Sequence, residues 1–322
     1  MNDYARAGVS LVKAEEVVER LRAAVESTRT PEVVGELGAF AGLYALDDER
    51  LLAATTDSVG TKLILSRRAG RLFDAGVDLA AHCINDVLTT GARPLFFLDY
   101  VASAALEPGE VVELVEGAAS TCRAAGCAIL GGESAELPGI YREGELDFAG
   151  TCVGLVLRSE LVDGSRCKPG DAVLGFPSSG LHANGFTLVR RLVGDDDFDP
   201  DLLLPPTRLY ADGVRALDAR CDVRGLAHVT GGGIPGNLPR VLPPLLRARI
   251  DPAAWERPAA YRWLDGRGVS EDEQRRVFNL GVGMCAVVPW TEAEAAGLPL
   301  IGRLETGGEG VVWEEGFLGA TS

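Results

Sequence analysis

Apolar positions in the first half of the chain recur at spacings that predict alternating helices and strands. Residues 11–28 carry an apolar stripe with helical spacing. Two further helices are predicted at 77–90 and 109–125, because a glycine follows each of these segments directly and glycine is common after the last residue of a helix. Short apolar runs predict strands at 51–56, 94–104, 127–130 and 148–157.

A polar, glycine- and proline-bearing segment at 158–170 interrupts this pattern. After it, a new apolar run at 172–176 predicts a strand, 183–193 a helix, and 285–288 a late strand. A chain of 322 residues exceeds the usual size of one domain. The sequence therefore predicts two α/β-type domains, 1–158 and 159–322.

Composition narrows the class of protein. Hydrophobic residues make up 47% and charged residues 24% of the chain, which is typical of globular proteins. There is no apolar run of the roughly 20 residues that a membrane span needs, and no apolar segment that resembles a secretory signal. The net charge of −16 disfavours binding to nucleic acid. Seven scattered cysteines without a Cys-x-x-Cys pair indicate free thiols, so we expect a cytoplasmic protein.

The first group of candidate functional residues follows the strand predicted at 51–56. Asp57 could hold a hard cation through its carboxylate oxygens. Gly60 allows the close approach of a phosphate, and Lys62 supplies a positive charge for it. The alternative is a capped turn followed by a surface lysine.

The second group lies in the helix predicted at 77–90. Asp86 follows Asp78 by about two helical turns, so both lie on one side of the helix. A carboxylate in this apolar context needs a partner or a metal. The alternative is a solvated polar stripe. His82, one turn before Asp86, could bind metal, although a single helical histidine is more often structural.

Three glycine-containing segments complete the set. Gly131 and Gly132 precede Glu133, and the double glycine could expose N–H groups to an anion; the alternative is a simple turn. Ser178–Gly185 leads into a helix whose N–H groups suit a phosphate, with His182 as a candidate acid or base; the alternative is helix capping. His228–Pro235 contains three glycines between apolar flanks, which argues against a flexible linker.

Each segment is weak evidence alone, but their joint order resembles the phosphoribosylformylglycinamidine cyclo-ligase family, the aminoimidazole ribonucleotide synthetases. The resemblance runs from about Tyr4 to about Gly302. The strings Pro94–Tyr100, Asn237–Pro243 and Phe278–Met284 are the most specific parts of it.

The resemblance implies an α+β fold in which each domain is a mixed sheet packed by helices. It also implies a homodimer in which the N-terminal domains pair. The implied activity uses ATP and Mg²⁺ to close the imidazole ring of a phosphoribosyl substrate, formylglycinamidine ribonucleotide. The formyl-amide oxygen is phosphorylated, the amidine nitrogen attacks, and phosphate leaves.

Site residues are carried over from the family by position. Asp57, Asp86 and Glu133 correspond to the acidic cluster near the metal and triphosphate. Lys62 corresponds to a phosphate contact, together with Gly60 and Thr61. The segment from Gly35 through Gly38 to Gly42 matches the mobile ATP loop of the family, and Asp86 and His182 match the pair implicated in the chemistry.

The chain departs from the family pattern in places. Ala39 and Ala41 stand in the ATP loop where glycine is frequent, so we expect a stiffer loop. Arg6 and Ser10 stand where acidic residues are common.

Related families remain as alternatives, namely selenophosphate synthetase, thiamine-monophosphate kinase and a hydrogenase-maturation dehydratase. No cysteine precedes Cys83, whereas selenophosphate synthetases carry a reactive one near the N-terminus. The relatives also tend to have aspartate where His228 stands. A non-catalytic nucleotide-binding protein on the same fold is a further alternative.

Overall fold

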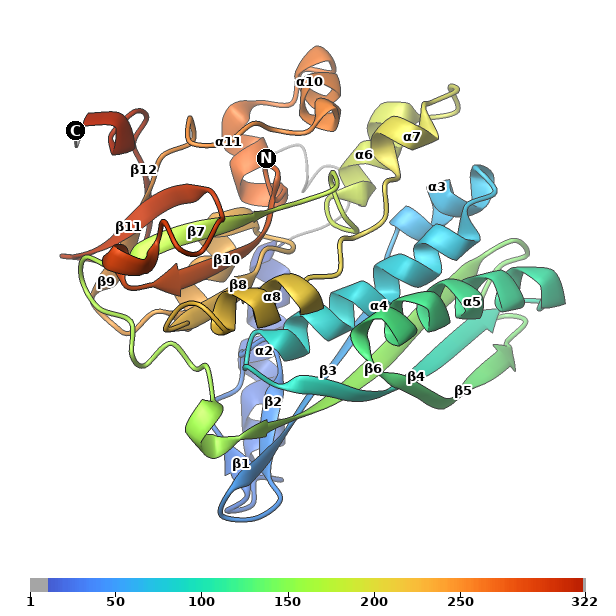
Figure 1. Cartoon of the computed structure of the whole chain (residues 1–322). Helices are drawn as coiled ribbons and strands as arrows, with labels where there is room; N and C mark the ends of the chain where they lie inside the picture. The colour runs from blue at the N-terminus through green and yellow to red at the C-terminus, as the bar shows by residue number, and fades with distance from the viewer. Residues whose placement is uncertain (1–10, 321–322) are drawn as a thin grey trace.

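The computed structural model describes residues 11–320 and contains two six-stranded sheets with helices packed on them (Figure 1). Each sheet combines one parallel strand pair with antiparallel pairs. This arrangement confirms the predicted α+β fold with two mixed sheets. Arg6 and Ser10 lie outside the described residues.

The first sheet has the strand order β1-β2-β3-β6-β4-β5. Its strands are β1 (Val33–Val34), β2 (Gly42–Ala45), β3 (Arg50–Ser58), β4 (Arg93–Ser103), β5 (Ala128–Glu136) and β6 (Leu146–Leu157). The helices that precede or connect them are α2 (Leu11–Glu26), α3 (Lys62–Arg68), α4 (Leu72–Leu88) and α5 (Pro108–Ala125). Helices α4 and α5 lie together over one face of this sheet (Figure 1).

Two glycines allow α4 and α5 to cross closely. A Cβ atom on Gly76 would lie 2.0 Å from the carbonyl oxygen of Leu114, and one on Gly117 would lie 1.9 Å from that of Phe73. Since such contacts are far inside van der Waals distance, only glycine fits at either position.

Among the described helices, α4 and α5 lie on one face of the first sheet and leave its other face uncovered. From Phe148 to the end of β6, every second residue is buried on the α4 side and the residues between them are partly or fully exposed. Apolar side chains on the uncovered face are Tyr44, Leu52, Phe96, Leu98, Tyr100, Val153 and Leu155.

The second sheet has the order β12-β9-β11-β7-β10-β8. Its strands are β7 (Ala172–Pro177), β8 (Gly225–His228), β9 (Leu246–Ile250), β10 (Val282–Val288), β11 (Leu300–Thr306) and β12 (Gly310–Trp313). Its helices are α6 (Phe186–Val193), α7 (Pro200–Leu203), α8 (Ala211–Asp218), α9 (Gly233–Asn237), α10 (Ala259–Gly266) and α11 (Glu271–Val277). The 3-10 segments are η1 (Arg158–Glu160), η2 (Leu238–Val241), η3 (Trp290–Glu292) and η4 (Leu318–Ala320).

The two halves of the chain share their hydrophobic cores. One cluster of buried residues runs from beneath α4 through α8 to one face of the second sheet. On the opposite face of that sheet, Phe40 from the first half packs among residues of the second half, including Val229 and Leu238. The domains are therefore joined through apolar contacts on both faces of the second sheet.

Several predicted elements differ at their ends. Helix α4 begins at Leu72 rather than 77, and α6 begins at Phe186 rather than 183. Strand β5 continues to Glu136 instead of ending at 130, because it pairs with β4 along its whole length. All seven cysteines are free and buried. No helix in the described part of the chain combines the length and apolarity needed to cross a bilayer.

Candidate active site at the domain junction

Helix α4 presents a polar face to the second half of the chain. Asp78, His82, Asn85 and Asp86 follow helical spacing and are all buried. The Asn85 side chain donates to the Arg208 carbonyl (2.9 Å) and accepts from the Tyr210 amide (3.0 Å). A solvated polar stripe is therefore the wrong description of this helix face.

Lys62 does not lie where a phosphate contact is expected. Its ammonium is fully buried, 2.7 Å from the Asp78 carboxylate, and donates to the Pro205 carbonyl at 3.1 Å. Asp78 also accepts from the backbone and the hydroxyl of Thr207, at 2.8 and 2.7 Å. The pair ties α3 and α4 to the segment 205–207, so Lys62 is neither a surface lysine nor directed at the Gly60 turn.

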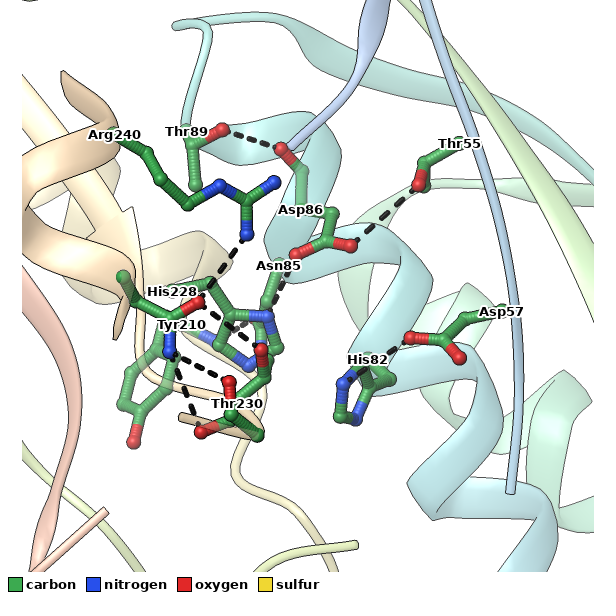
Figure 2. Close-up of polar contacts among 12 residues, drawn as sticks. Thr55, Asp57, His82, Asn85, Asp86, Thr89, Tyr210, His228, Thr230 and Arg240 are labelled. Atoms are coloured by element: carbon green, nitrogen blue, oxygen red, sulfur yellow. Dashed lines mark hydrogen bonds and ion pairs between the residues drawn. The ribbon is translucent and has the colours of Figure 1, made fainter. Parts of the chain in front are cut away.

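Asp86 pairs with His228 across the domain junction (Figure 2). One carboxylate oxygen of Asp86 lies 2.8 Å from Nδ1 of His228. The other carboxylate oxygen of Asp86 lies 3.5 Å from the Thr55 hydroxyl. We assign the imidazole proton to Nδ1, since that nitrogen faces the carboxylate. The Nε2 atom of His228 then carries a lone pair; this atom is buried and has no hydrogen-bond partner in the structure.

Burial shifts both members of this pair toward their neutral forms. It raises the pKa of Asp86 to about 7, although the positive charge of Arg240 acts in the opposite direction. Burial also lowers the pKa of His228 to about 3. Near neutral pH, His228 is therefore neutral and Asp86 is partly protonated; in the ionised form of Asp86, the Nδ1–H group of His228 donates to the carboxylate.

His82 and Asp57 form a second contact beside this pair. His82 Nε2 lies 3.3 Å from the Asp57 carboxylate, and the rings of His82 and His228 are 4.8 Å apart, edge to face (Figure 2). Burial lowers the pKa of His82, against the charge of Asp57. Asp57, at the end of β3, keeps part of its side chain exposed, so its carboxylate remains accessible.

His182 is buried near the same cluster but does not contact Asp86. Its backbone has a φ of +59°, a conformation unusual for any residue except glycine. Its Nε2 accepts from the amides of Ser179 (3.4 Å) and Arg208 (3.5 Å), while its Nδ1 has no partner. Burial holds the pKa of His182 well below its usual value, and the nearby His228 acts in the same direction.

Gly283 makes room for the His182 ring. A Cβ atom there would lie 2.5 Å from Cε1 of His182 and 2.0 Å from the Tyr210 hydroxyl. All three histidines of the chain, His82, His182 and His228, therefore gather in neutral form at one junction.

The predicted metal ligands are only partly brought together. Glu133 lies on β5, and strands β6 and β4 separate it from Asp57 on β3, a distance of roughly 14 Å at the usual strand spacing. Among the described residues there is no group of three or more His, Cys, Asp or Glu side chains arranged to hold a metal ion. Within one chain, Glu133 thus does not join Asp57 and Asp86, and the metal assignment stays a prediction.

Two glycines of the predicted ATP loop have positive φ, a backbone conformation that favours glycine. Gly35 and Gly38 have φ of +77° and +110°, and Gly42 begins β2. Ala39 and Ala41 do not have positive φ, so these departures from the family pattern cause no backbone strain. Gly60 has a φ of +65°, and the hydroxyl of Thr61 lies 3.0 Å from that of Thr187 in the second half.

Two other glycine segments have structural explanations. Gly131 and Gly132 lie within the edge strand β5, so they do not form the predicted anion-binding turn. The Gly231–Gly233 segment is fastened by Asn237, whose amide donates to the carbonyl oxygens of Thr230, Gly231 and Gly233. It is therefore not a flexible linker.

Two models of one family match the chain in succession. They describe the N-terminal and C-terminal domains of AIR synthase related proteins, and they match residues 38–156 and 168–313.

The chain belongs to the AIR synthase family.

Two curated relatives within this family are named phosphoribosylformylglycinamidine cyclo-ligase. One, from Synechococcus sp. (strain CC9605), is 48% identical over 310 residues, which is 91% of this chain and 90% of the relative. Another, from Sorangium cellulosum (strain So ce56), is 49% identical over 312 residues, covering 91% and 90%.

Solved structures of more distant proteins share the AIR synthase fold. A thiamine monophosphate kinase from Aquifex aeolicus matches with a TM-score of 0.66 at 17% identity, covering 92% of this chain and 95% of the kinase. A hydrogenase maturation protein in complex with ATP matches with a TM-score of 0.64 at 21% identity, covering 92% and 91%. At such low identity these likenesses show the fold alone.

Two side chains of this site, His228 and Arg240, were not predicted as site residues from the sequence. His228 begins one of the candidate glycine segments and is a position where relatives differ, and Arg240 lies in the Asn237–Pro243 string, but neither was assigned a role in the site. The scarcity of histidine was the available signal, since the chain has only three and each lies in a separate candidate segment.

Proposed function

We propose that this chain catalyses the ATP-dependent closure of formylglycinamidine ribonucleotide to aminoimidazole ribonucleotide. The observation that carries the proposal is the buried Asp86–His228 pair at the domain junction, with the neutral His182 beside it. The similarity to curated cyclo-ligases, at 48–49% identity over most of the chain, supports the same activity. The thiamine monophosphate kinase and the hydrogenase maturation protein described above are 17% and 21% identical to this chain, and this level of identity supports a shared fold alone.

The reaction needs a polar site from which water is excluded. The formyl-amide oxygen takes the γ-phosphoryl group of ATP, the amidine nitrogen then forms the new C–N bond, and the C–O bond to phosphate breaks. The amidine nitrogen must lose a proton as it attacks. A buried imidazole with a free lone pair suits this step, and His228 Nε2 is such an atom. In His182 the lone pair is on Nε2, which already accepts from two backbone amides, so its unpartnered Nδ1 carries the proton. The Asp86 carboxylate orients His228 and stabilises the positive charge that forms on its imidazole ring.

The donor atoms at this site fit Mg²⁺. Magnesium binds proteins through one or two carboxylates and completes its shell with phosphate oxygens and water. Asp57 and Asp86, from β3 and α4, are the residues that would hold it. Bound there, Mg²⁺ neutralises charge on the triphosphate.

We assign the nucleotide to the glycine-bearing segments that border the carboxylates. Gly35, Gly38 and Gly42 lie in one segment, and Gly60 and Thr61 in the other. Exposed glycines permit the close approach of phosphate oxygens to the backbone. We also infer a cytoplasmic protein organised as domains 1–158 and 159–322.

We further propose that two copies pair through the uncovered face of the first sheet. Leu98 is 40% exposed and Tyr100 is 36% exposed on β4, within a sheet whose helices α4 and α5 lie on the opposite face. A broad apolar face of this kind is typical of an interface between subunits.

The direct test of the activity is incubation of the protein with ATP, Mg²⁺ and formylglycinamidine ribonucleotide, followed by mass spectrometry. We expect one aminoimidazole ribonucleotide, one ADP and one phosphate per turnover. Phosphorylation of thiamine monophosphate in a parallel reaction, without any product from the amidine substrate, would contradict the proposal.

A further inference from the structure

Arg240 joins the glycine-rich loop of the first half to the second half. Its guanidinium stacks on the Phe40 ring, with its carbon 3.8 Å from the ring centroid. Its Nε and Nη2 atoms donate to the Gly38 carbonyl at 3.1 and 2.9 Å, and its Nη1 atom donates to the Asn237 amide oxygen at 3.2 Å. Phe40 is itself buried in the core of the second half.

These contacts leave part of the guanidinium unused. An arginine side chain has five N–H groups, and the three hydrogen bonds to Gly38 and Asn237 use three of them. One N–H group therefore remains on each of Nη1 and Nη2. Two such groups on neighbouring nitrogens match the paired oxygens of a phosphate.

Arg240 donates its hydrogen bonds to neutral acceptors, the Gly38 carbonyl and the Asn237 amide oxygen, and none of them goes to a carboxylate. It differs in this respect from Arg249 and Arg257, which are paired with glutamates. Arg240 nevertheless acts electrostatically on Asp86 and His228, so it lies beside the candidate active site. It is also exposed to solvent, which makes it accessible to a ligand.

We infer that Arg240 binds a phosphate group of the reactants through its two free N–H groups while its other edge holds the glycine-rich loop. This inference rests on the proposed function for the identity of the reactants. Arg240 would also supply the positive charge that Lys62, which is buried against Asp78, does not bring to the site. A phosphate at Arg240 would contact the same side chain that fixes Gly38, so its binding and the ordering of residues 35–42 are coupled.

The test compares Arg240→Gln and Arg240→Lys with the wild type. Glutamine removes the charge, whereas lysine keeps it but loses the planar pair of donors. The control is Arg267→Gln, because Arg267 also stacks on an aromatic ring (Trp263, 5.0 Å) and donates to a carbonyl (Leu192, 2.9 Å), yet belongs to the α10 region. Circular dichroism and ligand-free melting establish that each variant is folded.

Binding is measured by calorimetry in two separate titrations, one with Mg²⁺-ATP and one with formylglycinamidine ribonucleotide. Hydrogen exchange of residues 35–42 is followed in each. We expect Arg240→Gln to weaken the binding of one of the two ligands by roughly 10- to 100-fold, the scale of charge-assisted hydrogen bonds. That ligand should protect the loop in the wild type and in Arg267→Gln, but not in Arg240→Gln.

The ligand that loses affinity identifies the phosphate that Arg240 binds. Arg240→Lys should fall between the wild type and Arg240→Gln, and it serves as the test if the glutamine variant does not fold. Wild-type affinity for both ligands in a folded Arg240→Gln variant, or in Arg240→Lys if only that one folds, would overturn the inference. Because binding is measured without turnover, a protein that binds through Arg240 but forms no product would overturn the proposed function alone.

Discussion

The buried ion pair between Lys62 and Asp78 makes a quantitative prediction for Asp78→Asn. Both side chains are completely buried, so the substitution leaves an ammonium group without a counter-charge in the interior. Removing one partner of such a pair typically costs about 3–5 kcal/mol. The asparagine oxygen can still accept from Thr207, but its amide then faces the Lys62 ammonium. At about 2–4 °C per kcal/mol, we expect melting to fall by roughly 6–20 °C.

The matched control is Asp74→Asn, one helical turn earlier on α4. Asp74 forms a looser, partly exposed pair with Arg71, at 3.5 Å. A surface pair of this kind contributes about 0–1 kcal/mol. Urea denaturation of the three proteins at pH 7 measures both differences. An equal, small loss of stability in the two variants would refute the reasoning.

The pH dependence gives a second readout of the same pair. Burial lowers the pKa of Lys62 in the folded state, and Asp78 opposes that shift. Without Asp78 the folded pKa falls further below the unfolded value of about 10.4, so the unfolded state binds more protons and stability rises with pH up to that value. The stability gap between Asp78→Asn and the wild type should therefore narrow from pH 7 to pH 10. A stability difference that stays constant over this pH range would show that the Lys62 ammonium charge is not what destabilises Asp78→Asn.

Three further predictions concern the active site and the uncovered sheet. Asp86→Asn should reduce turnover by roughly 10² or more in a steady-state assay while the protein stays folded, and a variant with half of wild-type turnover would exclude the assigned role. Because the pKa of Asp86 is raised to about 7, its contribution to stability is present below about pH 4 and lost as the pH rises through 7. Without ligands, the wild type should therefore lose stability relative to Asp86→Asn over this range in thermal melts, and parallel curves would contradict the shift. Leu98→Glu should convert a dimer to a 33.9 kDa monomer in light scattering, whereas Val112→Glu on α5 should not; a Leu98→Glu protein that remains dimeric would exclude this face as the interface.

The sequence predicted the first half of the fold well because its signals are local. The apolar runs at 51–56, 94–104 and 148–157 correspond to β3, β4 and β6, and the helix predicted at 109–125 is α5. In the second half, β8, β9, β11 and β12 were not assigned from the sequence. The strands β8 and β12 have only four residues, too few for a clear alternation of apolar and polar positions. Strand β9 does alternate over its five residues, so its sequence pattern could have predicted it.

The candidate site was predicted in its residue types but not in its pairing. Asp86 and His182 were expected to act together, whereas the hydrogen bond to Asp86 comes from His228, 142 residues later in the chain. Lys62 was expected to meet a phosphate because it follows Gly60, but helix α3 turns its side chain toward Asp78. Glu133 was grouped with Asp57 by family position, and the order of strands separates them. Contacts of this kind depend on which distant elements meet, and a local pattern does not encode that.

The core shared by the two halves has a consequence for how the protein unfolds. One cluster of buried side chains crosses from α4 through α8 to the second sheet, and Phe40 of the first half completes the apolar layer on that sheet's other face. Neither half can lose its structure without exposing apolar surface of the other to water. The two family domains are therefore separate modules in sequence, but together they form one cooperative unit: they should melt in a single transition, and either half produced alone should aggregate or remain only partly folded.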